Sequence, residues 1–68
     1  MAEGSSNDAQ IIAAAYADRV TDLFKVFAEA VATGEPDRDA VVRFKRGLIA
    51  ARRVRDLALE AAKDTAEA

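Results

Sequence analysis

The sequence has no cysteine and no histidine among its 68 residues, and glycine occurs only at positions 4, 34 and 47. The missing thiols and imidazoles exclude disulfides, Cys or His metal ligands, and Cys or His catalysis. Isolated glycines exclude a Gly-rich phosphate-binding loop. The acid pair Asp18 and Asp22 has no third converging ligand. We therefore expect no metal, no cofactor and no catalytic residue, and we interpret the protein as not an enzyme.

Long hydrophobic runs are also absent. No apolar stretch approaches the length of a membrane-spanning helix, and no basic segment precedes an apolar run near the N-terminus. The sequence therefore predicts no membrane partner, and a cytoplasmic location is the default expectation.

Proline occurs once, at Pro36, close to Gly34. Nothing between Asp8 and Thr33 breaks a helix, Gly34 is a typical C-terminal cap, and Pro36 favours the start of a new helix. This pattern predicts an all-α fold, a two-helix antiparallel hairpin. We expect a flexible tail over 1–6 and a single helical-hairpin domain over 7–68. Its parts are helix 1 (about 8–33), a turn (34–36) and helix 2 (about 37–66).

Large apolar residues recur at three- and four-residue steps, which places them on one broad face of each helix. The predicted core and dimer residues are Ile12, Tyr16, Val20, Leu23, Phe24, Phe27 and Val31 in the first helix, and Phe44 and Leu48 in the second. Val42 and Ile49 point elsewhere, so the second helix has apolar residues in more directions than one neighbouring helix can cover.

A chain of this length gains only about 3–5 kcal/mol from a single core and usually needs a disulfide, a metal or a partner. The composition excludes the first and offers no obvious metal site. The sequence therefore predicts a homodimer in which two hairpins form a four-helix bundle, and the alternative is a marginal monomer that folds only on its target.

Charge is distributed unevenly along the chain. Residues 1–40 carry −5, residues 41–55 carry +6 and residues 56–68 carry −3, which gives the net charge of −2. The basic block 43–55 contains six cations and no acid. One interpretation is that these cations balance Asp18, Asp22 and Glu29 of the first helix, or acids of a second copy.

A second interpretation is an interaction surface, because an apolar centre with an Arg-rich rim is typical of protein interfaces. Its predicted partner-binding residues are Val42, Lys45, Arg46, Ile49, Arg52 and Arg53, and its partner would be another protein with an acidic surface. The predicted function is a small homodimeric regulator or inhibitor. The alternatives are a nucleic-acid-binding regulator that uses the basic block, and a structural subunit or adaptor of a larger assembly.

Two residues interrupt the helical pattern. Arg55 lies within the apolar stripe of the second helix, where a snorkelling or paired structural residue is more common than a ligand contact. If it is paired, an acid of the first helix or of a second copy is the expected partner. Gly47 lies inside the second helix, where it permits either a close helix crossing or a local kink.

Overall fold

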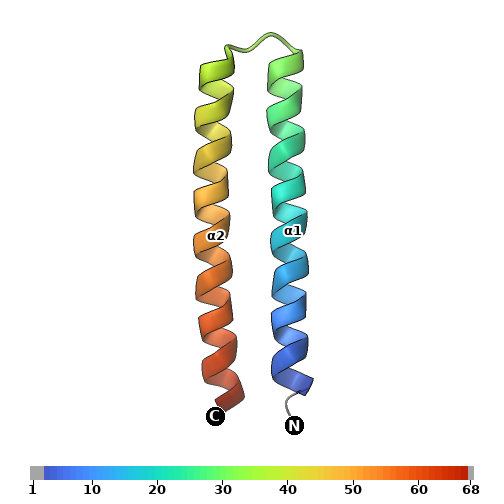
Figure 1. The fold of residues 1–68 in the computed structure, drawn as a ribbon, viewed down its shortest axis with the longest axis vertical. Coiled ribbons are helices and arrows are strands. Elements are labelled where there is room, and N and C mark those ends of the chain that lie inside the picture. Colours follow the sequence, from blue (N-terminus) through green and yellow to red (C-terminus); the bar gives the residue numbers. More distant parts are fainter. Residues whose placement is uncertain (1–2, 68) are drawn as a thin grey trace.

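The computed structural model describes the backbone of residues 3–67 and the side chains of residues 7–65. Two helices, α1 (Glu3–Ala32) and α2 (Asp37–Glu67), lie side by side and antiparallel (Figure 1). The predicted helical hairpin is therefore confirmed. Helix α1 begins five positions before the predicted start, so 3–6 of the expected tail is helical backbone, and residues 1–2 lie outside the described residues.

A glycine cap ends α1. Gly34 has a φ of 93°, and its N–H donates to the carbonyl of Val31 at 3.1 Å. The N–H of Glu35 donates to the carbonyl of Ala30 at 3.0 Å. This pair of bonds is the Schellman arrangement, in which a left-handed residue lets the chain turn back over the last helical carbonyls.

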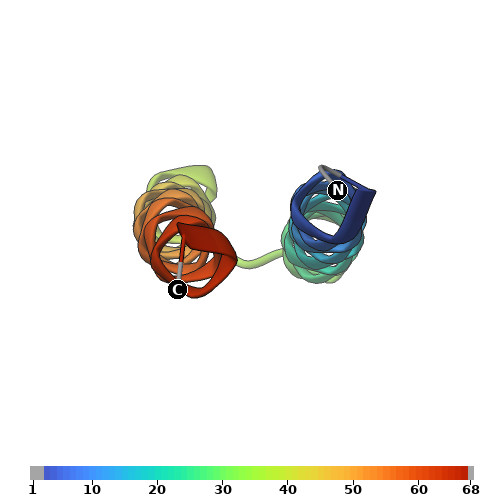
Figure 2. The same ribbon diagram turned by 90° about the horizontal axis from the view of Figure 1, so that it is seen from below.

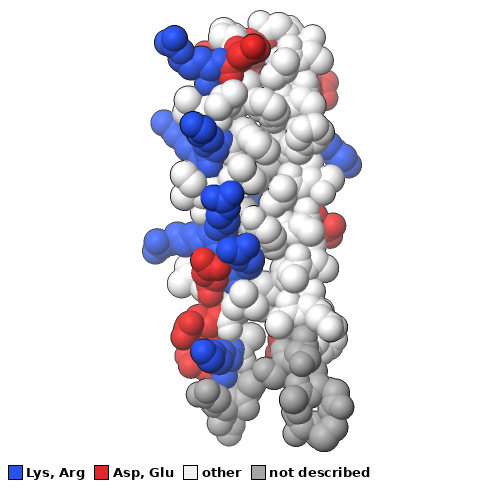
Figure 3. Space-filling view, viewed as in Figure 1, with Lys and Arg blue, Asp and Glu red and all other residues white. Residues whose placement is uncertain are grey.

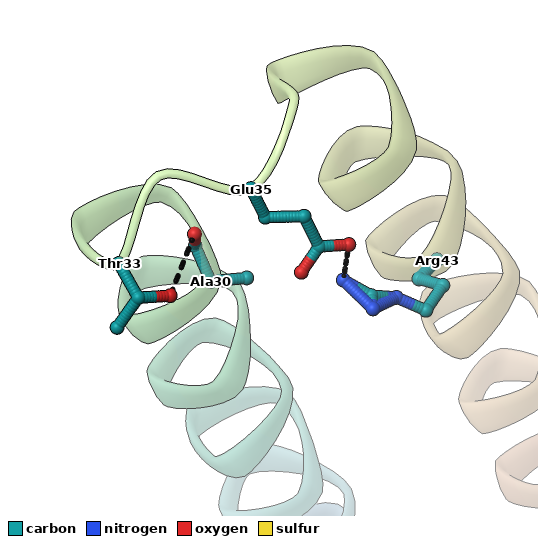
Figure 4. A network of polar contacts seen from close by, with 4 residues as sticks. All are labelled: Ala30, Thr33, Glu35 and Arg43. Atoms are coloured by element: carbon teal, nitrogen blue, oxygen red, sulfur yellow. Dashed lines mark hydrogen bonds and ion pairs between the residues drawn. The ribbon is translucent and has the colours of Figure 1, made fainter.

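Pro36 and two acids begin α2. The carbonyl of Pro36 accepts bonds from the N–H groups of Asp39 and Ala40, at 3.1 and 3.2 Å. Asp37 and Asp39 lie in the first turn, where the helix dipole favours negative charge. An ion pair between Glu35 and Arg43 joins the turn to α2 (Figure 4).

The two helices are held in register by contacts at matched levels. The rings of Phe27 and Phe44 stack with their centroids 4.9 Å apart. The guanidinium of Arg55 lies 4.5 Å from the centre of the Tyr16 ring. At each level the residue numbers of the two helices add up to about 71.

The core between the helices is shallow. The buried apolar residues among those described are three alanines, Ala30, Ala40 and Ala51. The large side chains of the interface are only half-buried: Ile12, Tyr16, Val20, Leu23, Phe27, Phe44 and Leu48. Figure 2, viewed along the helices, shows the reason for this partial burial: the two helices form a single layer, so each helix is covered by the other on one side only.

The hairpin is an elongated rod with a larger surface than a compact chain of its size. Its radius of gyration is 15.7 Å, whereas about 11 Å is expected for a globular domain of this length. Its accessible surface is 5262 Å², whereas a folded monomer of this mass exposes about 4200 Å². The single chain therefore leaves apolar surface uncovered.

Neither α1 nor α2, over the part of the chain that the structure describes, has an apolar stretch long enough to cross a lipid bilayer.

Candidate interaction surfaces

The first surface, which we call the apolar face, lies along one side of the hairpin. Its members in α1 recur at three- and four-residue steps, and each lacks charge: Ala13, Ala17, Val20, Phe24, Ala28 and Val31. Val41, Leu48 and Leu59 follow the same spacing on α2. The charged residues of α1 point to its other side. Figure 3 shows α1 largely uncharged across its front, with charged side chains along its outer edge.

The apolar face is open where it meets the turn. A hollow there is lined by Phe24, Phe27, Ala28, Val31, Ala32, Asp37 and Val41. Phe24 is 57% exposed, Val31 is 40% exposed and Val41 is 37% exposed. Phe24 and Val31 were predicted as core or dimer residues, and within one chain they do not contribute to the core between the helices. Their role as dimer contacts remains a prediction.

The second surface, the outer surface of α2, consists of the six predicted partner-binding residues Val42, Lys45, Arg46, Ile49, Arg52 and Arg53, all of them exposed. Ile49 is 64% exposed, more than Val42 at 41%. Ile49, Arg52 and Arg53 line one hollow together with Asp56, Leu57 and Glu60.

Sequence reasoning missed the last three of these residues. Leu57 is 58% exposed and extends the apolar centre of the outer surface beyond the basic block. A signal for it exists, because residues 49, 53 and 57 follow at four-residue steps on one side of a helix. The predicted surface ends with the basic block, whereas the hollow continues along α2 to Glu60.

Lys45 and Arg52 lie where the two surfaces meet. Residues 41, 45, 48 and 52 follow one another at three- and four-residue steps, so Lys45 and Arg52 lie on the same side of α2 as Val41 and Leu48 and also border the apolar face. Figure 3 shows Lys and Arg side chains along α2 beside the uncharged front of α1. The apolar face is thus apolar on α1 and partly cationic on α2.

Among the side chains of residues 7–65, no acid of α1 forms an ion pair with a cation of the outer surface. The ion pairs among the described residues join Arg43 to Glu35 and Arg55 to Asp56. Neither pair uses an acid of α1, so the hypothesis that the basic block balances Asp18, Asp22 and Glu29 within one chain finds no support. Asp22 lines a groove together with Arg43, but Arg43 forms its ion pair with Glu35 of the turn instead. Pairing with a second copy remains a prediction.

Arg55 corrects another expectation. Its Nε donates to Oδ1 of the adjacent Asp56 at 3.1 Å, and its guanidinium covers the ring of Tyr16. The acid partner therefore comes from the same helix, not from the first helix. One third of the Arg55 side chain is exposed, and a contact of this type contributes about 0.5–2 kcal/mol. Arg55 is a structural residue of the single hairpin.

The side opposite the apolar face is mixed. Val26 and Val54 are each 66% exposed there. Grooves on this side are also lined by charged residues, among them Arg19, Asp22 and Arg43. One of these grooves is mostly apolar and is lined by Ile12, Tyr16 and Val54 among others, with Arg19 and Arg55 as its charged members, so this side combines apolar and charged residues. No trio of acids within the described residues is grouped closely enough to hold a metal ion.

No protein-family model matches the sequence, and no curated protein and no solved structure is significantly similar to it. The function therefore has to be argued from the two surfaces.

Proposed function

We propose that this protein is a non-enzymatic interaction module that acts as a homodimer and binds another protein. Two hairpins close into a four-helix bundle through the apolar face, and the outer surface of α2 stays free for the partner. The observation that carries this proposal is the exposure of large apolar side chains on two separate sides of a hairpin, represented by Phe24 and Ile49.

The large accessible surface of the single hairpin supports a second copy of the chain as the molecule that covers the apolar face. Two separate hairpins expose twice 5262 Å², whereas a compact particle of the combined mass exposes about 6900 Å². Closing two hairpins would therefore bury up to about 3600 Å² in total, within the range of obligate dimers. At about 25 cal/mol per Å² of apolar surface, such burial offsets the weak core of the monomer.

The chemistry of the outer surface supports a protein with an acidic patch as the partner. Ile49 and Leu57 supply an apolar centre, and Arg46 and Arg53 supply a cationic rim. Arginine at an interface forms bidentate bonds with carboxylates, and an apolar centre excludes water from them.

Ile49→Asp tests the assignment, because a carboxylate at the centre of the surface would repel an acidic partner. Val54→Asp is a matched control, since Val54 lies on the same helix, is similarly exposed (66% against 64% for Ile49), and faces the mixed side. The tagged wild type and both variants are used to capture proteins from a lysate of the source cells, with circular dichroism as the check of the fold. We expect one protein to be captured by the wild type and by Val54→Asp, and lost with Ile49→Asp.

Capture of the same protein by Ile49→Asp would overturn the outer surface as the binding site. Equal loss with Val54→Asp would show that the effect is not specific to this surface.

Nucleic-acid binding is the second candidate. The observation in its favour is that Lys45, Arg46, Arg52 and Arg53 are exposed and take no part in the ion pairs of the described residues. Against it, the acidic chain weakens attraction to phosphates, and no aromatic residue stands among these cations to stack bases. Titration with mixed RNA and DNA at low salt separates the two functions, because binding that falls steeply with salt would favour nucleic acid.

A further inference from the structure

We infer that the second copy packs with its α2 against α1 of the first copy, so that the two-fold axis runs parallel to the helices. This inference rests on the proposed dimer and concerns its architecture. The alternative two-fold axis, perpendicular to the helices, would place α1 against α1 and α2 against α2. Both arrangements give a four-helix bundle with antiparallel neighbours, and charge and side-chain size distinguish them.

Charge disfavours contact between the two α2 helices. The side of α2 that borders the apolar face carries Lys45 and Arg52, and α2 has no acid between Asp39 and Asp56. An antiparallel α2–α2 seam centred on the middle of α2 (Asp37–Glu67) would therefore set Arg52 of one copy opposite Arg52 of the other. Like charges in facing positions destabilise helix pairs. Against α1, the same cations meet an uncharged helix whose apolar surface their aliphatic stems can cover.

Levels along the rod support the same arrangement. A two-fold axis parallel to the helices leaves every residue at the same height along the rod. A residue of α1 therefore meets a residue of the second copy's α2 when their two numbers add up to about 71 or slightly more, as within the chain. On the apolar face this sets Val31 beside Val41 and Phe24 beside Leu48. Large apolar residues would thus meet large apolar residues.

Small residues of α1 meet long residues of α2 at the other levels. Ala28 lies level with Lys45, and Ala17 lies level with Arg55. A methyl group opposite a long side chain leaves room for the aliphatic stem, which is the size alternation that well-packed interfaces need. Two long cationic residues of α2, Lys45 and Arg55, are therefore level with alanines of α1, whereas Arg52 is level with Val20.

Arg55 is compatible with this packing. The two copies of Arg55 would share one level, but they would stand on diagonally opposite helices, about 11–14 Å apart for ordinary helix spacing. Each guanidinium is already bonded to Asp56 and stacked on Tyr16. The pair therefore meets at a distance and with part of its charge compensated.

Engineered disulfides test the arrangement, because the natural chain has no cysteine to interfere. Ala28→Cys and Lys45→Cys are introduced together and separately, and Ala17→Cys is made as a third single variant. All three positions are exposed in the hairpin, so the fold tolerates the changes. After mild oxidation, a non-reducing gel reports covalent dimers, and sedimentation reports the dimer before oxidation.

We expect the double variant to form a covalent dimer and the single variants to stay uncrosslinked. Efficient crosslinking of Ala17→Cys or Ala28→Cys alone would place α1 against α1, and that of Lys45→Cys alone would place α2 against α2. Either result overturns the arrangement and leaves the dimer intact. A dimer in sedimentation with no crosslinking in any variant also overturns it. A monomer at all concentrations would remove the dimer itself, and the two failures are therefore distinguishable.

Discussion

Gly47 leaves little room for a side chain beside α1. A Cβ added there would lie 2.5 Å from Cδ2 of Leu23, which is closer than ordinary carbon contacts allow. A glycine inside a helix costs about 1 kcal/mol relative to alanine, so a reason for its presence is expected. Of the two sequence interpretations, the close approach of the helices is the one that this contact supports.

The close contact between Gly47 and Leu23 implies that the effect of a substitution at position 47 on stability depends on the side chain at position 23. Gly47→Ala gains about 1 kcal/mol of helix propensity but must displace a terminal methyl group of the half-buried Leu23 side chain, which offsets that gain. We expect no net stabilisation in the natural sequence. In a Leu23→Ala background the overlap disappears, and Gly47→Ala should then stabilise the fold by about 1 kcal/mol.

Urea denaturation of the four proteins, followed by circular dichroism at one protein concentration, measures this coupling. An equal effect of Gly47→Ala in both backgrounds would contradict the contact.

At the scale of the elements, the turn depends on the left-handed backbone of Gly34. Residues with a Cβ pay about 1–2 kcal/mol to adopt this conformation, whereas asparagine tolerates it better. We expect Gly34→Ala to destabilise the hairpin by about 1 kcal/mol and Gly34→Asn to cost less. Thermal unfolding of the two variants gives the ranking, and a higher melting temperature for Gly34→Ala than for Gly34→Asn would be inconsistent with the cap.

The two helices and their turn could be predicted because local chemistry determines them. Gly34 and Pro36 occupy positions with a specific backbone requirement, and the three- and four-residue spacing of apolar side chains is a strong helical signal. Helix α1 begins at Glu3, before the expected start at about residue 8, although the side chains of Asn7 and Asp8 are of the types that commonly cap a helix N-terminus. A favourable cap indicates where a helix can begin and does not prevent it from beginning earlier.

The interaction surfaces were harder to predict, since they depend on which side of each helix the other helix covers. The spacing assigned Phe24 and Phe27 to the same broad stripe, yet Phe27 stacks on Phe44 while Phe24 stays exposed. The partner of Arg55 was missed for a similar reason, because a neighbouring acid and an aromatic ring satisfy it locally. The spacing of apolar residues identifies the apolar side of a helix. Which of those residues contact the neighbouring helix and which stay exposed depends on how the two helices pack.

At the scale of the whole molecule, the rod measures 52 × 15 × 8 Å between its Cα extremes, which is too thin for an enclosed core. A second copy would double its thickness across the apolar face. This gives a prediction that separates the two sides of α1, because Phe24 and Val26 are similarly exposed and face different ways.

Phe24→Asp should weaken dimerisation by at least about 100-fold, since it would bury an unpaired carboxylate between the copies. Val26→Asp, on the mixed side, should leave the dimer unchanged. Sedimentation equilibrium over a dilution series measures both. Persistence of the dimer in Phe24→Asp, or its loss in Val26→Asp, would place the second copy elsewhere.

The antiparallel register also sets an order in which the rod can assemble. Phe27 and Phe44 are seventeen positions apart along the chain, whereas Tyr16 and Arg55 are thirty-nine apart. Closing the longer loop from the unfolded chain costs about 0.7 kcal/mol more in entropy. Contacts between α1 and α2 nearest the connecting turn therefore form first. Each contact that forms shortens the free chain that the next contact must close. The contacts farthest from the turn are the last to form and the first to open.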